Sequence, residues 1–239
     1  MNDISEEQGS RRTGRGNRPA EVIAEVAMPV YRHDEAPPPW CELKAFEIID
    51  LKPGDAVSRG QGHAKTRVLC TTGTTQLFAG GGSLVLKEGQ FADLHLIGGD
   101  KVWQARPGSP IAQLVVLSGS WGEDLGGCGM FRVTEDPTAT NAGDAVAYPK
   151  RTRIDSHYHD CDEYWIVLEG RATVVVGGQA MDMSAGDCVS IGMGHHHDMP
   201  LAPDPIKAVF FETTLQRDKR IGHLWNHTHG IAQPHPERI

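Results

Sequence analysis

Residues 157–163 of this chain read His-Tyr-His-Asp-Cys-Asp-Glu, and residues 186–197 read Gly-Asp-Cys-Val-Ser-Ile-Gly-Met-Gly-His-His-His. Successive side chains of an extended strand point to opposite faces, so the imidazoles of His157 and His159 share one face and can reach one ion. Glu163 would return on the neighbouring strand, and the glycine turn can deliver His197 to the same point. Three histidines and a carboxylate suit a divalent iron, manganese, nickel or zinc ion. The alternative is that these histidines only occupy the polar face of a strand.

The spacing of these residues follows a known pattern. His-x-His-x-x-x-Glu with Gly170 seven residues later, then Gly186, five residues and Gly-x-Gly-x-x-His, resembles the two conserved motifs of the cupin superfamily. The resemblance implies a small double-stranded β-helix, or jelly-roll, barrel in which His157, His159, Glu163 and His197 bind one metal ion per chain. Two positions depart from the pattern. Arg151 replaces the usual glycine of the first motif and Gly192 the usual proline of the second, and neither position supplies a ligand.

The sequence repeats at an offset of 97 residues. This offset aligns four glycines of one copy with four of the other: Gly73, Gly80, Gly81 and Gly89 with Gly170, Gly177, Gly178 and Gly186. Both copies combine short apolar runs, glycine turns and a Gly-Gly hairpin, which predicts two similar β-barrels. The same offset places Gly60, Gly62, Thr66 and approximately Asp100 opposite the four proposed ligands, and His63 stands alone. The resemblance is therefore to a bicupin in which only the C-terminal barrel keeps the metal motifs.

The predicted class is all-β, with two cupin-like barrels in one chain and an extended N-terminal arm. The predicted segments are an arm at 1–45, a degenerate barrel without metal ligands at 46–120, a glycine-rich linker at 121–145, a metal-binding barrel at 146–215 and a tail or lid at 216–239. A short helix over 21–27 is the one helical expectation.

Composition restricts the classes of partner. The 239 residues carry a net charge of −8, which makes the chain a poor match for nucleic acid, and no apolar run approaches the roughly 20 residues that cross a membrane. The first residues lack the apolar core of a secretory signal, so we expect a cytoplasmic protein. Five widely spaced cysteines argue against a disulfide framework. Since cupin-like barrels commonly pair, we expect a homodimer that binds a small-molecule substrate.

We chose the catalytic candidates by two criteria. They lie near the motifs in sequence, or strand alternation places them on the same face as a proposed ligand. Tyr148 and Glu212 are possible acids or bases because they lie near the motifs in sequence, and His195 is a possible pocket residue for the same reason. Arg153 shares the face of His157 and can anchor an anionic substrate, or it can be a solvated side chain at the rim. Trp165 shares the face of Glu163 and should lie near the metal, either in the core or against substrate.

The tail is rich in imidazole and aromatic groups for a terminus. His223 and Trp225 can contact substrate if the tail is a lid over the barrel mouth. The alternative is a strap that docks on the first barrel or on a second subunit.

The expected function is that of a metal-dependent enzyme acting on a small polar, oxygen-rich substrate, carbohydrate-derived or carboxylate. The metal would act as a Lewis acid in isomerase- or lyase-type chemistry. An iron-dependent dioxygenase is one alternative, and a cupin that binds metal and ligand without turnover is another.

Overall fold

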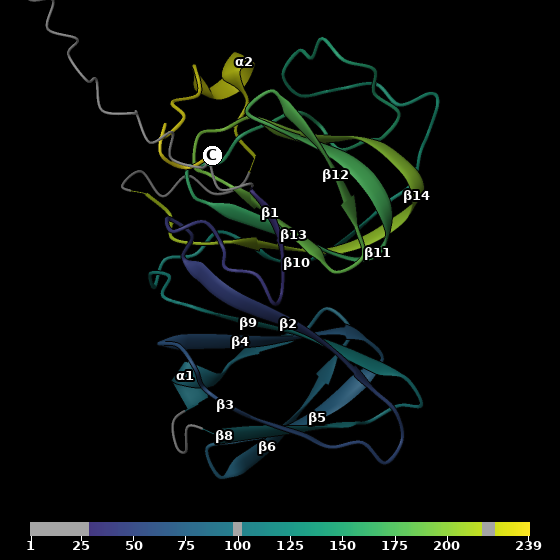
Figure 1. Cartoon of the computed structure of the whole chain (residues 1–239), viewed down its shortest axis with the longest axis vertical. Coiled ribbons are helices and arrows are strands. Elements are labelled where there is room, and N and C mark those ends of the chain that lie inside the picture. The colour runs from purple at the N-terminus through teal and green to yellow at the C-terminus, as the bar shows by residue number, and fades with distance from the viewer. Residues whose placement is uncertain (1–28, 98–101, 217–222) are drawn as a thin grey trace, which may run out of the picture.

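The computed structural model of this protein describes residues 29–97, 102–216 and 223–239, and strands dominate these residues (Figure 1). The helix predicted at 21–27 lies outside the described residues. The strands are β1 (Val30–Arg32), β2 (Leu43–Leu51), β3 (Val57–Gly60), β4 (Lys65–Thr72), β5 (Thr74–Ala79), β6 (Gly82–Lys87), β7 (Phe91–Asp93), β8 (Val102–Pro107), β9 (Ala112–Gly119), β10 (Cys128–Val133), β11 (Glu163–Val176), β12 (Gln179–Ser184), β13 (Asp187–Ile191) and β14 (His197–Glu212). Two four-residue helices, α1 (Leu94–Ile97) and α2 (Asn226–His229), accompany them. The all-β class is confirmed.

Residues 43–119 form what we call the first β unit, the lower half of Figure 1. Its two four-stranded sheets have the orders β2-β9-β4-β7 and β3-β8-β5-β6. Apolar residues from both sheets make one core, in which Leu77, Trp103 and Leu114 are almost completely buried.

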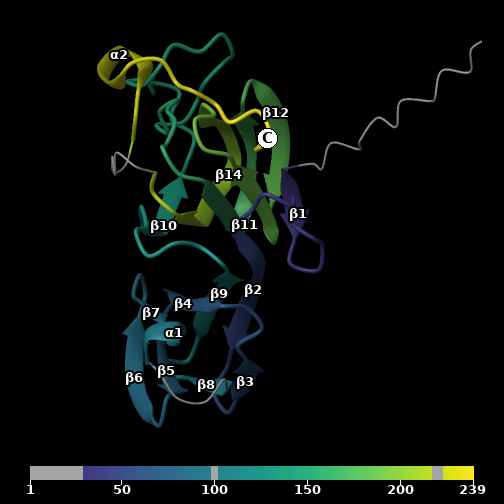
Figure 2. The ribbon, with the colours of Figure 1, turned by 90° about the vertical axis from the view of Figure 1, so that its left-hand side faces the viewer.

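Residues 128–215, together with β1, form the second β unit. Its sheet has the order β1-β13-β11-β14-β10, and β12 pairs with β11. The long strands β11 and β14 pair through several register shifts, which let them bend around a second core containing Trp165, Val174 and Met199. Figure 2 shows β1 against this unit although it precedes the first unit in sequence.

Two segments differ from the predicted organisation. Part of the predicted N-terminal arm is β1, in which Val30 pairs with Val189 of the second unit. The predicted linker contains β10, which pairs with β14 from Cys128 to Val133. Its glycines read as a connection in the sequence, but they allow a strand to approach its neighbour closely.

The internal repeat is visible in the backbone. Gly80 and Gly81 join β5 to β6 with φ of +56° and +77°, and Gly177 and Gly178 join β11 to β12 with φ of +56° and +83°. Such left-handed pairs are the turns that match the twist of a tight hairpin. The sheets built from the described strands are open, so the two-barrel form of the fold stays a prediction.

The two units share an apolar contact. Leu43, Phe46 and Leu117 of the first unit belong to the same buried cluster as Tyr164 and Phe211 of the second. The Tyr164 hydroxyl also accepts the Glu42 backbone N–H at 2.9 Å. No helix among the described residues is long and apolar enough to span a membrane.

Candidate metal centre

Four side chains gather in the second unit at the positions that the motif spacing indicated. His157, His159, Glu163 and His197 are each no more than 4% exposed, and one ligand atom from each lies within 4.8 Å of the others. The backbones of His157 and His197 exchange hydrogen bonds of 3.2 and 2.8 Å, so the two residues face each other. Glu163 begins β11 beside them. The structure thus brings together all four predicted ligands.

Backbone carbonyls orient two of the imidazoles. Nδ1 of His157 donates to the Asp155 carbonyl at 2.6 Å, and Nδ1 of His197 donates to the His195 carbonyl at 3.0 Å. A carbonyl only accepts, so both rings carry their proton on Nδ1 and present the Nε2 lone pair to the cluster. Burial, and next the neighbouring His197 and His159, lower the pKa of His157 well below its usual value, which keeps this ring neutral.

Trp165 orients the carboxylate. Its indole N–H donates to Oε1 of Glu163 at 2.7 Å, and Oε2 of Glu163 lies 2.9 Å from Nε2 of both His159 and His197. Burial raises the pKa of Glu163, but contact with His159 and His197 outweighs burial and holds the pKa well below its usual range. The cluster therefore contains an ionised carboxylate.

The polar atoms at the centre of the cluster fit a cation. Oε2 of Glu163 and Nε2 of His197 are buried and approach to 2.9 Å without hydrogen-bond geometry. A buried polar atom without a partner costs about 1–3 kcal/mol, and a divalent ion would satisfy both lone pairs. Two oriented imidazoles, a third imidazole and a carboxylate are also a common donor set for such ions.

A pocket of about 270 Å³ opens beside the cluster. It is lined by Phe131, Arg153, Ile154, Asp155, His157, Glu163, Trp165, Phe210, Glu212, His223 and Trp225. Arg153, Trp165, Glu212, His223 and Trp225 are the predicted pocket and catalytic candidates in this set, while Phe131 and Phe210 had no signal beyond ordinary apolar strand positions. The pocket thus combines an apolar wall with acidic and imidazole groups.

Tyr148 and His195 lie elsewhere. The Tyr148 hydroxyl donates to Asp198 at 3.2 Å, and Nε2 of His195 bonds to the His235 carbonyl at 2.9 Å. Asp198 follows His197 directly in β14, so its side chain points to the opposite face of the strand. Proximity in sequence placed Tyr148 near the metal, whereas strand alternation sends it away.

Arg153 lies at the rim of the pocket. Its side chain is 77% exposed and forms an ion pair of 2.6 Å with Asp136. Hydrogen bonds from Thr138 and Arg153 lower the pKa of Asp136 to about 2, so this pair stays charged over the physiological range. A substrate anion would have to share Arg153 with Asp136.

A second buried carboxyl lies beside the cluster. Oε1 of Glu212 is 3.7 Å from Nδ1 of His159, and Oε2 accepts the Gly127 backbone N–H. A Cβ on Gly126 would lie 2.2 Å from Oε2 of Glu212, which explains a glycine at that position of the predicted linker. Burial, and next the charge of Glu163, raise the pKa of Glu212.

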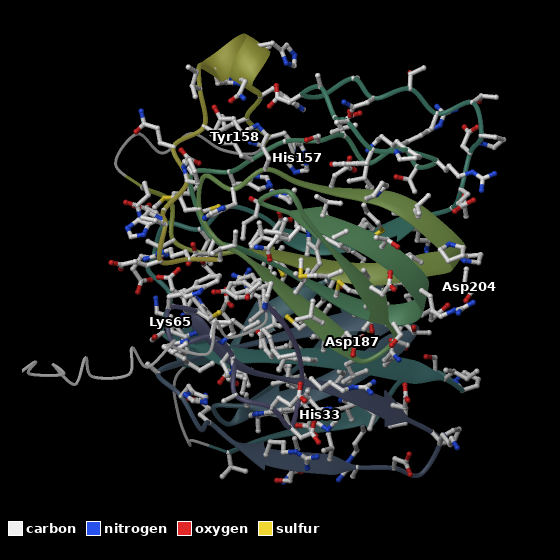
Figure 3. The ribbon with its side chains drawn as sticks, turned by 45° about the horizontal axis from the view of Figure 1, so that its top comes forward. His33, Lys65, His157, Tyr158, Asp187 and Asp204 are labelled. Carbon is white, nitrogen blue, oxygen red and sulfur yellow. The ribbon has the colours of Figure 1, made fainter. Side chains whose placement is uncertain are left out.

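The C-terminal tail docks on the second unit itself. Leu224 and Tyr158 exchange backbone hydrogen bonds of 2.9 and 3.0 Å, and Arg238 forms a 2.5 Å ion pair with the buried Asp162. Figure 3 shows Tyr158 and His157 beneath this segment. The His223 ring lies 4.4 Å from the His157 ring, centre to centre, and Trp225 follows it into the pocket wall. The described part of the tail, residues 223–239, is therefore both a strap and a cover, and it docks on the second unit rather than on the first.

Docking of the tail explains one departure from the cupin pattern. A Cβ at Gly192 would lie 1.8 Å from the Arg238 carbonyl oxygen, so the tail needs a glycine there. We predict that Gly192→Ala displaces residues 233–239 and lowers the free energy of unfolding by about 1–3 kcal/mol, because Asp162 loses its ion pair with Arg238 and keeps only the hydrogen bond from the Met193 backbone N–H. Hydrogen exchange of the tail amides measures the displacement. Gly82→Ala, whose Cβ would meet only the Ala79 carbonyl at 3.8 Å, is the matched control. Unchanged protection in the Gly192 variant would contradict this account.

The Trp165 hydrogen bond gives another prediction. Trp165→Phe keeps an aromatic ring against Phe131, whose centroid lies 5.5 Å from that of Trp165, but removes the donor to Glu163. We expect metal affinity to fall about 10- to 100-fold, the usual effect of losing an outer hydrogen bond to a ligand. Competition with a chelator measures the change. Trp121→Phe, in the apolar contact between the units, should leave affinity unaltered. Equal metal affinities in the two variants would show that the hydrogen bond from Trp165 to Glu163 does not support metal binding.

Comparison with known proteins agrees with the fold. A family model described as a cupin domain matches residues 144–211. The uncharacterized protein y4oW of Sinorhizobium fredii (strain NBRC 101917 / NGR234) is 46% identical over 212 residues, which cover 89% of this chain and 97% of that protein. A single-site mutant of oxalate decarboxylase OxdC from Bacillus subtilis matches with a TM-score of 0.50 at 8% identity, covering 82% of this chain and 78% of that chain. An IolB-like protein from Salmonella typhimurium LT2 matches with a TM-score of 0.48 at 12% identity, covering 77% and 88%. Residues 144–211, the greater part of the second unit, therefore belong to the cupin superfamily, as the motif spacing predicted.

Proposed function

We propose that this protein is a metal-dependent enzyme that moves a proton on a small, oxygen-rich substrate, in isomerase- or lyase-type chemistry. The observation that carries this proposal is Glu212, a buried carboxyl in the pocket that is outside the four-residue cluster and adjacent to it. A dioxygenase needs open positions on its metal but no such second carboxyl. Proton transfer needs a group of this kind within reach of the substrate.

The cluster would hold the ion, and a bound divalent ion would polarise a carbonyl or hydroxyl oxygen of the substrate. Glu163 is held by Trp165 and cannot also serve as a free base. Glu212 can take a proton at Oε1 from a hydroxyl-bearing carbon next to that carbonyl and return it to the carbonyl carbon, while the hydroxyl proton passes to the former carbonyl oxygen, so that no further reactant is required. The Gly127 N–H fixes its other oxygen.

The rest of the pocket would bind and shield the substrate. Phe131, Phe210 and Trp225 exclude water from the reacting atoms, which strengthens electrostatic interactions there. The volume of about 270 Å³ suits a molecule the size of a small sugar or hydroxy acid. His223, carried by the docked tail, can donate or accept a hydrogen bond at the substrate.

The test uses the full chain loaded separately with iron, manganese, nickel and zinc. Small aldoses, ketoses and 2-oxo acids are incubated in deuterated water, and carbon-bound deuterium is measured by NMR, with oxygen uptake recorded in parallel. Exchange without oxygen uptake is the expected result. Oxygen uptake with the iron form would instead support an iron-dependent dioxygenase, and a ligand retained unchanged on every metal form would support a cupin that binds without turnover.

We further propose that the first unit is a cupin-like barrel that has lost its metal ligands, and that the protein is a homodimer. The repeated hairpins support the first proposal. Analytical ultracentrifugation of the full chain tests the second, and a monomer at micromolar concentration would rule it out.

A further inference from the structure

The pocket beside the metal cluster is built on neighbouring strands whose side chains lie in rows. Glu163 pairs with Glu212 between β11 and β14, and in the adjacent row Trp165 pairs with Phe210. Phe210 in turn pairs with Gly129 of β10. Side chains two residues apart share one face of a strand, so the two carboxyl groups lie next to the two aromatic rings. Both carboxyl groups and both rings line the pocket.

Several apolar side chains at this pocket keep accessible surface. Phe131, Ile154 and Phe210 pack against the core of the second unit, but they are only partly buried, and all three line the pocket. Trp225 of the tail is also partly buried and lines it as well. Apolar surface left uncovered in a concave site is typical of ligand-binding grooves. We call these four residues the apolar recess.

Two glycines of the predicted linker determine where the Phe210 ring lies. A Cβ at Gly127 would be 2.8 Å from Cε2 of Phe210, and a Cβ at Gly129 would be 3.0 Å from Cε1. The ring therefore lies directly over the backbone of these two residues, and a methyl group at either position would displace it. The shape of the apolar recess thus depends on two positions without side chains.

The hydrogen-bonding groups of the pocket are concentrated at its metal end. Glu212 and His223 both adjoin the cluster. Away from the cluster, Arg153 is occupied by its 2.6 Å ion pair, and Asp155 accepts a backbone N–H at 2.8 Å. A hydroxyl group placed against the apolar recess would lose its hydrogen bonds to water without replacement, which lowers affinity about 5- to 100-fold. The recess therefore favours a carbon skeleton without hydroxyl groups.

We propose that the substrate of this pocket is amphipathic, a 2-hydroxy carbonyl compound whose carbonyl carries an aryl or branched alkyl group. The oxygen-bearing end would lie between the cluster and Glu212, and the apolar group would cover the recess. A fully hydroxylated sugar leaves hydroxyl groups against Phe131 and Phe210 and is the poorer ligand. This inference rests on the proposed function for the reacting end of the substrate and on the apolar recess for the other end.

Three probes with the same reacting end test the recess. Hydroxyacetone, dihydroxyacetone and 2-hydroxyacetophenone differ only in the group on the carbonyl, which is methyl, hydroxymethyl or phenyl. Calorimetric titration of the zinc-loaded full chain measures their affinities and does not require turnover. We expect the phenyl compound to bind about 10- to 100-fold more tightly than the methyl one, the gain for burying roughly 100 Å² of further apolar surface, and the hydroxymethyl compound to bind no better than the methyl one. Equal affinities, no binding of the phenyl compound, or tightest binding of dihydroxyacetone would overturn the proposal.

Two variants locate the apolar group. Phe131→Ala removes one ring of the recess and Phe210→Leu shortens another, so each should lower the preference for phenyl over methyl about 3- to 10-fold while hydroxyacetone binds as in the parent. The ratio of the two affinities is measured within one protein, so a less stable variant still gives an answer. Phe78→Ala, on β5 of the first unit, is the matched control and should keep the parent ratio. A parent ratio in both recess variants would exclude the recess as the site of the phenyl group.

Proton exchange in deuterated water is measured separately from affinity. Tight binding of 2-hydroxyacetophenone with full retention of its carbon-bound protons would refute the proposed isomerase chemistry and leave the apolar recess established. Exchange of all three probes with equal affinities would have the opposite meaning, because the chemistry would stand and the recess would have no role in binding.

Discussion

His159→Ala is expected to abolish stoichiometric metal binding by the whole chain. Nε2 of His159 lies 3.1 Å from Nε2 of His157 and 2.9 Å from Oε2 of Glu163, so its loss opens one side of the cluster. Loss of a ligand should reduce affinity by more than the roughly 10- to 100-fold expected for an outer hydrogen bond. Elemental analysis of untagged protein, purified without added metal and again after reloading, measures the change.

The control for this prediction lies in the first unit. His63 lines a separate cavity in the first unit and belongs to no cluster of metal-binding side chains among the described residues, which do not include Asp100. His63→Ala should therefore retain about one ion per chain, the stoichiometry of a single four-ligand site. One ion per chain retained in His159→Ala would contradict the single-site assignment.

Glu212→Gln is expected to remove substrate proton exchange while leaving metal content unchanged. The amide oxygen of glutamine can still accept from Gly127, so the backbone contact is kept, but an amide cannot take up the proton. The loss should be about 100- to 10,000-fold, the range for a positioned acid or base. Deuterium incorporation per bound metal ion is the measurement.

Two further observations make this result specific. Glu237→Gln changes an exposed tail carboxylate by the same chemistry and should exchange at the parent rate. Metal content has to be equal in the three proteins, because Glu212 is near His159. Parent-level exchange in Glu212→Gln would remove this carboxyl from the proposed mechanism, whereas equal loss of metal and activity would make it a positioning residue.

The four clustered residues could be predicted because the local rules that place them are short-range. Two histidines at i and i+2 share a face in any extended segment, and the glycine turn before His197 fixes where the next strand begins. The repeat was visible for a similar reason, since the Gly-Gly hairpins require backbone angles that few other residues adopt. Strand alternation likewise placed Trp165 in the pocket.

Contacts between residues far apart in the sequence were harder to predict. The glycines at 126–127 look like a flexible connection in sequence, but they are small because the Glu212 side chain packs directly on them. The direction of the tail depends on Gly192 and on the buried Asp162, which no local pattern connects to Arg238. Tyr148 became a catalytic candidate because it lies near the motifs in sequence. Closeness in sequence does not determine the face of the strand on which its partner, Asp198, lies. The homodimer and the cytoplasmic location stay predictions.

The pairing of β1 with β13 has a consequence for the order of assembly. Because β1 precedes the first unit in the chain and its partner strand follows it, the first unit is in effect an insertion between two strands of the second. During synthesis β1 cannot pair until its partner β13 has been made, and β13 follows most of the chain. Cutting the chain between the units would also leave β13 with a bare edge, open to the β1 of another copy. The second unit therefore completes its sheet only with a strand that lies before the first unit in the chain.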